Sequence, residues 1–335
     1  MRCCLFVVAP VLLTVCASSV SAQGAEEKEN KMLRAGLIGL DTSHVVAFTG
    51  QINSADNGPM GKVKVVAAYR GGSPDLPISA NRIDGFTKTL QEKHDIEIVD
   101  SIDELLKRVD VVLLESVDGR PHLKQARPVI QAGKPLFIDK PIAASLEDVI
   151  EIYELAAKHK VPCFSSSSLR FREELQSLRG GNEEIGDIVR CDVGGSLSAL
   201  PGHPELAFYG IHGIEMLFTV MEPGCETVTW QEDGVVKGVW KDGRIGTFKK
   251  GPNVVEVTGT KGTTQCGGGN YGGLLTAMCT FFETGEPPVP PEETINLFAF
   301  IVAAQKSKDN GNVPVAIREV MTEARGVITE RNKAR

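Results

Sequence analysis

Two residues in the second half of the chain have the types and the spacing for acid–base chemistry. His212 and Glu215 are three residues apart, so they share a face if this segment is helical. A histidine with a pKa near neutrality is a natural proton acceptor for a hydroxyl group that is being oxidised. Because many lone histidines are purely structural, His212 is a candidate base only in combination with further reactive groups.

A reactive lysine is expected in the segment Asp139-Lys140-Pro141, which follows the apolar run 136–138. A lysine at the carboxyl end of a strand, preceded by an acid and fixed by a proline, is placed to donate a hydrogen bond to a substrate hydroxyl. The alternative is an Asp–Lys pair on the surface, which would contribute little to stability.

A nucleotide site is suggested by the turn Gly39-Leu40-Asp41-Thr42-Ser43-His44 after the first predicted strand. Dinucleotide sites favour G-x-G-x-x-G here, so that the backbone can approach the pyrophosphate. Asp41 and His44 replace the second and third glycines, and a carboxylate beside a pyrophosphate repels it. Three interpretations stay open: a helix cap made by Asp41 or Thr42, a modified nucleotide site, or a site for another ligand.

The end of the second predicted strand, Tyr69-Arg70-Gly71-Gly72, lacks the acid that binds the ribose hydroxyls of NAD. Arg70 could instead bind a 2′-phosphate, which would favour NADP. The alternative is a solvated loop arginine.

Strand-like and helical segments alternate between residues 33 and 165. The predicted strands are 33–39, 63–69, 96–99, 109–114, 136–138 and 161–164. The predicted helices are 45–52, 82–94, 123–132 and 145–160, and a further helix begins at a capping box formed by Ser101 and Glu104. This alternation predicts an α/β fold whose N-terminal part is a Rossmann-type, doubly wound parallel sheet.

The pattern changes after residue 165. Strand-like runs include 228–232, 235–240 and 254–258, with turns at 233–234 and 242–243, and helices are predicted at 274–283 and 292–308. This arrangement predicts an α+β domain with an open, mainly antiparallel sheet. We expect a signal peptide at 1–22, a linker at 23–31, a Rossmann-type nucleotide-binding domain at 32–165 and an α+β substrate or oligomerisation domain at 166–335.

The N-terminus predicts export. Arg2 precedes an apolar run at 5–15, and the segment ends Val20-Ser21-Ala22, which is typical of a signal peptide cleaved near Ala22. We therefore expect a periplasmic or secreted protein. Two alternatives are a transmembrane anchor, for which the run is short, and lipid attachment at Cys16.

Composition excludes several partners. The 335 residues carry a net charge of −7 and no dense basic cluster, which argues against nucleic acid and, beyond export, against a membrane partner. Five cysteines follow the leader with no CxxC pair, so we expect no structural zinc site. Buried thiols are the simpler expectation, and one disulfide is the alternative.

In their order and spacing, these segments resemble the Gfo/Idh/MocA family of oxidoreductases. The resemblance covers the chain from residue 33 to the C-terminal helices. It rests on the turn at Gly39, a PNxxH-like segment at 117–122, the EKP-like segment 139–141 and the GxHxxD-like segment 210–215.

The resemblance implies a Rossmann domain followed by an open α+β domain, and it assigns roles to individual residues. Lys140 would orient substrate and nicotinamide, and His212 would be the catalytic acid/base. The substrate-binding residues would be Asp139, His122, Arg170 and Glu215. NAD or NADP would be bound by Gly39, Asp41, Thr42, Ser43, His44, Arg70 and Pro141, and no metal is expected.

The resemblance further implies an NAD(P)-dependent oxidoreductase that acts on a hydroxyl or keto group of a sugar or cyclitol. A homo-oligomer is implied by analogy with the family. Two departures keep other functions open: two glycines of the turn are replaced, and Phe208 stands where the family has an aspartate four residues before the histidine.

Two alternative functions follow from these departures. One is a cofactor-independent carbohydrate lyase or hydrolase that uses His203, Glu205, His212 and Glu215, with or without a metal. The other is a non-catalytic sugar-binding protein on the same fold.

Overall fold

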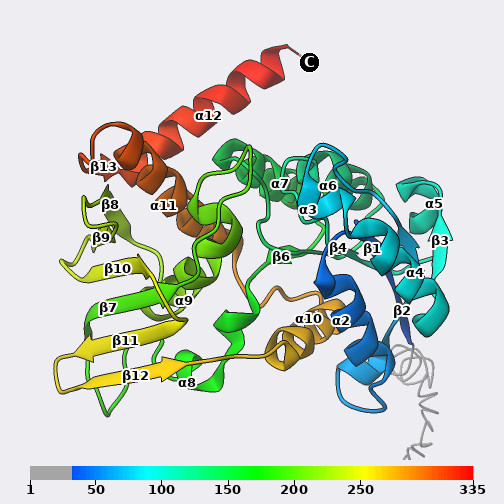
Figure 1. Ribbon diagram of the computed structural model, residues 1–335, viewed down its shortest axis with the longest axis horizontal. Helices are drawn as coiled ribbons and strands as arrows, with labels where there is room; N and C mark the ends of the chain where they lie inside the picture. Colours follow the sequence, from blue (N-terminus) through cyan, green and yellow to red (C-terminus); the bar gives the residue numbers. More distant parts are fainter. Residues whose placement is uncertain (1–31, 335) are drawn as a thin grey trace, which may run out of the picture. The chain divides into compact units, whose positions relative to one another are not determined.

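The first half of the protein is built on a six-stranded parallel sheet (Figure 1). The structure, a computed structural model, describes residues 32–334, so the predicted signal peptide and linker lie outside the described residues. The strands are β1 (Leu33–Ile38), β2 (Val63–Tyr69), β3 (Glu97–Val99), β4 (Val111–Leu114), β5 (Leu136–Ile138) and β6 (Cys163–Ser165). Their order is β3-β2-β1-β4-β5-β6, which confirms the predicted doubly wound sheet.

Helices connect these strands and cover the sheet. They are α2 (Ser43–Asn53), α3 (Pro77–Ala80), α4 (Ile83–His94), α5 (Ile102–Leu106), α6 (His122–Gln131) and α7 (Leu146–His159), with a 3-10 turn η1 (Met60–Lys62) before β2. The Ser101 hydroxyl accepts a hydrogen bond from the Glu104 amide, as the capping box predicts. The short helix α3 was not predicted, and it lies in the long connection between β2 and α4.

A seven-stranded sheet forms the second half. Its strands are β7 (Ile188–Gly195), β8 (Cys225–Trp230), β9 (Val236–Trp240), β10 (Ile245–Lys250), β11 (Val254–Gly259), β12 (Thr263–Gly267) and β13 (Val315–Ala316). They run in the order β12-β11-β7-β10-β9-β8-β13, and the β7–β10 pair is parallel whereas the other pairs are antiparallel. The prediction of a mainly antiparallel sheet is confirmed.

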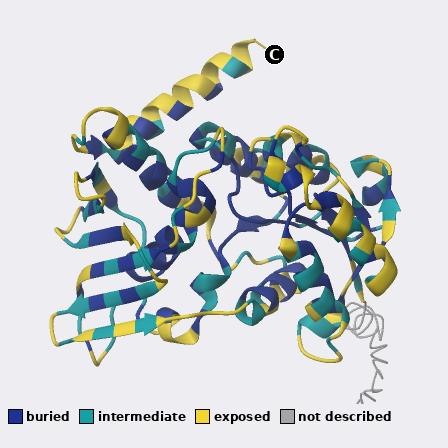
Figure 2. Cartoon of the chain, viewed as in Figure 1, coloured by how far each residue is buried: buried dark blue, intermediate teal, exposed yellow. Residues whose placement is uncertain are grey.

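The helices of the second half are η2 (Ser168–Phe171), α8 (Glu173–Gln176), the π-helical turn η3 (Leu206–Gly210), α9 (Ile211–Met221), α10 (Gly272–Thr284), α11 (Pro291–Asp309) and α12 (Ile317–Lys333). Helix α9 packs on β7 and β10, and ten of its eleven residues are buried (Figure 2). It therefore holds His212 rigidly near the first sheet.

Helix α10 joins the core of the first sheet, although it follows the second sheet in sequence. Its residues Leu274, Leu275, Met278, Phe281 and Phe282 pack in one cluster with strands β1, β2 and β4. Figure 1 shows α10 beside α2. The predicted domain boundary at residue 165 coincides with the last residue of β6. It assigns α10 to the second domain, although α10 packs on the sheet of the first.

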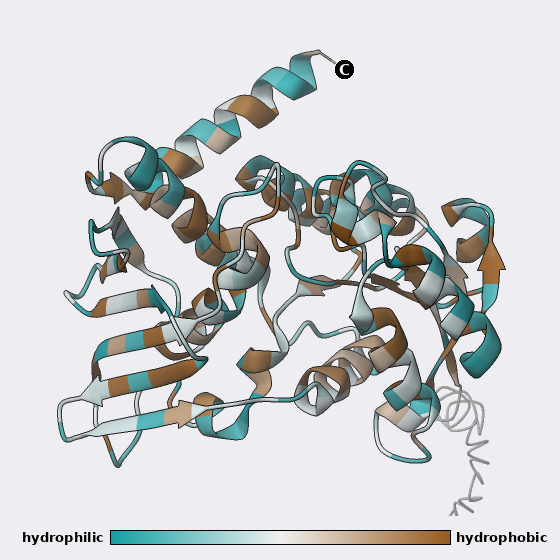
Figure 3. Cartoon of the chain, in the orientation of Figure 1, coloured by the Kyte–Doolittle hydropathy of each residue, from teal (hydrophilic) through white to brown (hydrophobic). Residues whose placement is uncertain are grey.

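Helix α12 was not predicted, although its buried residues Ile317, Val320, Ala324 and Ile328 recur at helical spacing. They alternate with polar ones along the helix (Figure 3). Arg331 anchors it to α7 through ion pairs with Glu147, Asp148 and Glu151. Among the described helices, none is long and apolar enough to span a bilayer.

Candidate active site

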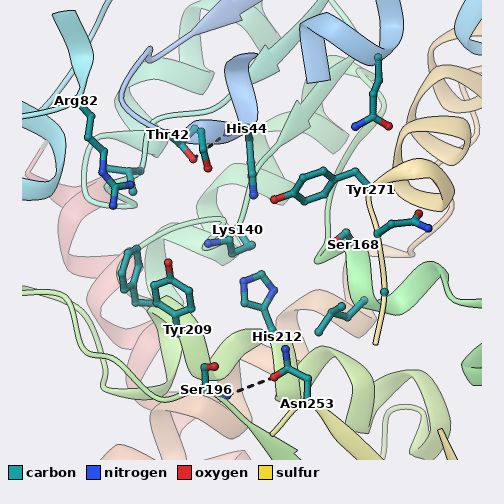
Figure 4. A pocket seen from close by; sticks show the side chains of 17 residues that line it. Thr42, His44, Arg82, Lys140, Ser168, Ser196, Tyr209, His212, Asn253 and Tyr271 are labelled. Carbon is teal, nitrogen blue, oxygen red and sulfur yellow. Dashed lines mark hydrogen bonds between the residues drawn. The ribbon is translucent and has the colours of Figure 1, made fainter. Parts of the chain in front are cut away.

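A cavity of about 530 Å³ lies between the carboxyl edge of the first sheet and the second half of the chain. Its walls come from the start of α2, the end of β5, η2, η3, α9 and the loop before α10 (Figure 4). The lining side chains that can do chemistry are Thr42, Ser43, His44, Arg82, Lys140, Ser168, Tyr209, His212, Asn253, Asn270 and Tyr271. The structure thus brings the predicted catalytic pair, Lys140 and His212, into one cavity.

Lys140 is largely buried, and its peptide bond to Pro141 is cis. Its ammonium lies over the rings of Phe208 and Tyr209, 5.3 and 5.5 Å from their centroids. Burial lowers the pKa of Lys140, and the negative charges of Asp139 and Glu115 only partly oppose this. A lowered pKa favours the neutral amine, the form that can accept a proton.

His212 stands on the first turn of α9, and its Nδ1 lies 2.7 Å from the Ser167 hydroxyl oxygen. That oxygen already accepts a hydrogen bond from the Leu169 amide, so its own hydrogen is free to be donated to Nδ1. Burial, aided by the positive charge of Lys140, lowers the pKa of His212 to about 3. The prediction of a pKa near neutrality is therefore wrong, and a Ser167 hydroxyl that donates to Nδ1 leaves Nε2 to carry the proton of the neutral imidazole.

His44 lies at the start of α2, and its Nδ1 is 2.7 Å from a carboxylate oxygen of Asp139. Burial alone would raise the pKa of Asp139, but the charges of His44 and Lys140 outweigh that effect and lower it. The ring of His44 stacks on Phe48 and meets the edge of Tyr271. The chain therefore has a histidine–carboxylate pair at the cavity, formed by residues other than those of the family pattern.

Glu115 directly follows β4 and is not among the residues predicted from the sequence. It is fully buried, and among the described residues no group donates a hydrogen bond to either carboxylate oxygen. Burial raises its pKa well above the usual value, the charge of Asp139 raises it further, and the charge of Lys140 only partly opposes this. An acidic residue directly after the apolar run 109–114 was the signal that could have identified it.

Two predicted substrate-binding residues lie outside the cavity. The Arg170 guanidinium donates hydrogen bonds to Glu215 and Glu293, at 2.6 and 2.5 Å, and all three side chains are buried. The second oxygen of Glu215 accepts from the Ser167 amide. Arg170 and Glu215 therefore support the loop that carries Ser167, the partner of His212.

His122 is also buried away from the cavity. Its two ring nitrogens face the carbonyl oxygens of Ile142 and Ser116 at 3.1 and 2.9 Å, and burial lowers its pKa. It ties the start of α6 to the segment after Pro141.

The alternative cluster His203, Glu205, His212 and Glu215 is not assembled. His203 Nε2 accepts a hydrogen bond from the Gly119 amide, and Glu205 pairs with Lys308 at the surface. The cluster of metal-ligand type within residues 32–334 consists instead of His44, Glu115 and Asp139.

The glycine turn is closed on itself. Gly39 has a φ of +86°, and a Cβ there would lie 2.5 Å from the backbone nitrogen of Ser116. The amides of Gly39 and Leu40 donate to the carbonyls of Tyr69 and Arg70. These contacts favour glycine for a reason of packing, whether or not a nucleotide binds.

Asp41 points into the crevice between β1 and β4, where the strand order reverses. It is fully buried, and its two oxygens accept hydrogen bonds from the Val117 amide at 2.9 Å and the Ser79 hydroxyl at 2.6 Å. Dinucleotides cross a doubly wound sheet at this point. The side chain of Asp41 therefore occupies part of the expected path.

The connection between β2 and α4 closes the crevice further. The Ser73 hydroxyl donates to Asp118, and Leu76 packs with Val117, Leu200 and Phe208. A second cavity of about 470 Å³ lies on the far side, at the ends of β2 and β3. Within residues 32–334, no residue lines both cavities.

The remaining residues predicted to bind the cofactor do not lie in one cavity. Thr42, Ser43 and His44 line the first cavity. Arg70 forms an exposed ion pair with Asp84 and lies outside both cavities. All five cysteines within the described part of the chain are free thiols, and Cys266 alone of them is not fully buried.

Comparison with known proteins supports the same fold. Residues 78–167 match the Gfo/Idh/MocA family model, described as an oxidoreductase family with an NAD-binding Rossmann fold. No curated protein matches the chain significantly in sequence.

Solved structures resemble most of the chain. Apo scyllo-inositol dehydrogenase from Lactobacillus casei has a TM-score of 0.69 at 15% identity, over 86% of this chain and 99% of that one. Myo-inositol 2-dehydrogenase from Lactobacillus plantarum has a TM-score of 0.66 at 16% identity, over 85% of this chain and 99% of that one. A probable dehydrogenase from Thermotoga maritima has a TM-score of 0.67 at 21% identity, over 86% of this chain and 100% of that one. The chain therefore has the two-domain fold of these dehydrogenases, and residues 78–167 carry the sequence pattern of the Gfo/Idh/MocA oxidoreductases.

Proposed function

We propose that this protein is an NAD(P)-dependent oxidoreductase that acts on a hydroxyl or keto group of a sugar or cyclitol. The observation that carries the proposal is the cavity that Lys140 and His212 share with the N-terminus of α2. The neighbours that act on inositols support a polyhydroxylated substrate.

The residues present fit the nicotinamide half of a dinucleotide. Thr42 and Ser43 begin α2, and a helix N-terminus attracts phosphate through its free amides and dipole. Arg82 lines the same cavity and adds positive charge. A bound nicotinamide would supply the hydride acceptor or donor for the substrate carbon.

The adenosine half fits only if residues 73–80 move, because the Asp41–Ser79 hydrogen bond and the Leu76 cluster separate the two cavities. We therefore propose that this segment leaves the crevice when the dinucleotide binds. Because only open molecules would bind the dinucleotide, the apparent Kd would equal the Kd of the open form divided by the fraction of molecules that are open.

Within the cavity, Lys140 is the residue that moves the proton. As a neutral amine, Nζ would accept the proton of a substrate hydroxyl during oxidation, and as an ammonium it would return one to a keto oxygen during reduction; burial shifts the pKa towards the neutral form. His212 stays neutral and donates a hydrogen bond through Nε2 to the same oxygen. Figure 4 shows Lys140 between the rings of His44 and His212.

The substrate faces side chains suited to a sugar or cyclitol. Asn253, Asn270 and Ser168 present amide and hydroxyl groups to the cavity, and the Ser196 amide donates to the Asn253 side chain. Tyr209 and Tyr271 supply flat apolar faces with hydroxyl tips. Such a mixture fits a ring that carries several hydroxyl groups.

A second function is favoured by the closed crevice. If residues 73–80 stay in place, the cavity is a site for acid–base chemistry without a dinucleotide, as in a carbohydrate lyase. Lys140 would then abstract a proton next to a carbonyl or leaving group, with His212 as the hydrogen-bond donor.

One assay separates the two functions. The protein is incubated with a panel of inositols, monosaccharides and oxidised sugars, with and without NAD or NADP, and the products are identified by mass spectrometry. Oxidised or reduced products that require NAD(P) support the oxidoreductase. Elimination products formed without NAD(P) support the lyase and overturn the first proposal.

We also propose, from the N-terminal pattern, that the protein is exported and cleaved near Ala22. Detection of a mature N-terminus at Gln23 in the extracytoplasmic fraction would support this. A full-length chain retained in the cytoplasm would contradict it.

A further inference from the structure

Glu115 is a buried acid whose carboxylate has no hydrogen-bond partner among the described residues. It is fully buried at the end of β4. Burying a carboxylate without a partner is costly, and folded proteins generally pair such groups or give them a metal ion. Either a proton or a cation must therefore compensate Glu115.

Two further ligand groups lie beside it. One ring nitrogen of His44, one oxygen of Glu115 and one oxygen of Asp139 all lie within 4.8 Å of one another. They come from three elements whose ends meet at the carboxyl edge of the sheet: α2, β4 and β5. We propose that these three side chains form a site for a divalent transition-metal ion, with Zn²⁺ as the best match.

The donor set selects the class of ion. Carboxylates alone favour Mg²⁺ or Ca²⁺, whereas an imidazole shifts preference towards transition metals. One histidine and two carboxylates suit a three-ligand zinc site that keeps a further position open. Because Glu115 is without a partner, binding would satisfy its carboxylate rather than break an existing interaction.

The His44–Asp139 pair is already near the spacing of two metal ligands, whereas the Glu115 carboxylate, which lies within 4.8 Å of the other two ligand atoms, has to move closer to bind the same ion. His44 Nδ1 and Asp139 Oδ2 are 2.7 Å apart, which is a hydrogen-bond distance. Two ligands of a tetrahedral zinc ion stand about 3.3 Å apart, given bonds of about 2.0–2.1 Å. An ion could therefore replace the shared proton with a shift of roughly half an ångström.

Lys140 does not already fill this role. Its ammonium faces the rings of Phe208 and Tyr209 on the cavity side, and within residues 32–334 no ion pair joins it to Glu115. Lys140 supplies at most one positive charge, which balances only one of two ionised carboxylates. A divalent ion offsets both.

The site would place the ion at the floor of the cavity. His44 lines the cavity, whereas Glu115 and Asp139 are buried beneath it. A water molecule or a substrate oxygen could then complete the coordination and be polarised by the ion. The inference goes beyond the proposed function and holds for either chemistry.

Metal binding can be measured without substrate or dinucleotide. The chelator-treated protein is titrated with ZnCl₂ and with MnCl₂ by calorimetry, beside E115Q, H44Q and the control E92Q, whose glutamate is exposed on α4. We expect one Zn²⁺ per chain with tighter binding than Mn²⁺. E92Q should match the parent, and E115Q and H44Q should each lose more than the ~10–100-fold that removing a residue behind a ligand costs.

The absorption of bound Co²⁺ gives a second readout, since its visible bands report coordination. Absence of stoichiometric binding by the parent protein would overturn the inference. Equal binding by E115Q and H44Q would do the same, because it would place the ion elsewhere. If E115Q fails to fold, as judged by thermal unfolding, H44Q decides, because His44 is partly exposed at the cavity.

Discussion

The Ser79 hydroxyl donates a 2.6 Å hydrogen bond to the Asp41 carboxylate and thereby joins the β2–α4 connection to the turn after β1. Both side chains are buried, and the Ser73 amide donates to the same Ser79 oxygen. The bond crosses the crevice in which a doubly wound sheet binds a dinucleotide. The occupancy of that crevice decides between the two proposed chemistries.

Removal of the Ser79 hydroxyl should open the crevice. S79A leaves Asp41 buried with one partner fewer, so we expect a loss of about 1–3 kcal/mol in the free energy of unfolding. If the segment moves to admit the dinucleotide, the same variant should bind NADH or NADPH more tightly, because opening costs less. Urea unfolding and fluorescence titration measure the two effects, with S177A on the surface as control; a less stable variant with unchanged affinity would argue against a moving segment.

Lys140 should carry most of the proton transfer. K140M keeps the volume and removes the amine, so kcat should fall by roughly 10²–10⁴-fold. The K140M variant should fold, because the ammonium that it removes makes no ion pair within the described residues. K88M, on the exposed face of α4, is the matched control. Turnover of K140M at the parental rate would remove Lys140 from the mechanism.

His212 should affect stability in acid. Its pKa is about 3 in the folded protein and about 6.5 when unfolded, so the unfolded chain binds more protons between these values. The contribution of the neutral ring is therefore full above pH 6.5 and is lost as the pH falls towards 3. Thermal unfolding of H212N should depend less on pH over this window than that of the parent or of H159Q, an exposed control. Identical pH dependences would contradict the buried, neutral state.

Arg170 should matter for folding rather than for substrate binding. Its pairs with Glu215 and Glu293 are buried, and removing one partner of such a pair costs about 3–5 kcal/mol. R170M should therefore unfold at much lower urea concentration. R34M, which breaks a surface pair with Asp110, should change the urea midpoint far less. A stable R170M with a raised KM would restore the substrate-binding role expected from the sequence.

Much of the fold followed from local patterns. The continuous apolar run before Glu115 and the capping box at Ser101 are set by neighbouring residues, so the strands and helices of the first half were recognised. Helix α3 was missed because four residues give no periodicity. Helix α12 was missed although Ile317, Val320, Ala324 and Ile328 recur at helical spacing; its anchoring to α7 by Arg331 depends on residues far away in the sequence.

The site was only partly accessible from the sequence. Lys140 and His212 were found because each stands in a short recognisable segment. The placement of Arg170 behind the site depends on Glu293, 123 residues away, and no local pattern encodes that pairing. The contact of His44 with Asp139 likewise depends on the meeting of strand ends. The burial that lowers the pKa of His212 arises only in the folded chain.

The most direct test of the account is a calorimetric titration of the protein with NAD, NADP and their reduced forms, together with analysis of nucleotide released on acid denaturation. The account predicts micromolar binding of one of these dinucleotides, strengthened in S79A, or a nucleotide that copurifies. No binding by the parent or by S79A, and no released nucleotide, would contradict the oxidoreductase proposal and leave the acid–base chemistry of Lys140 without a dinucleotide.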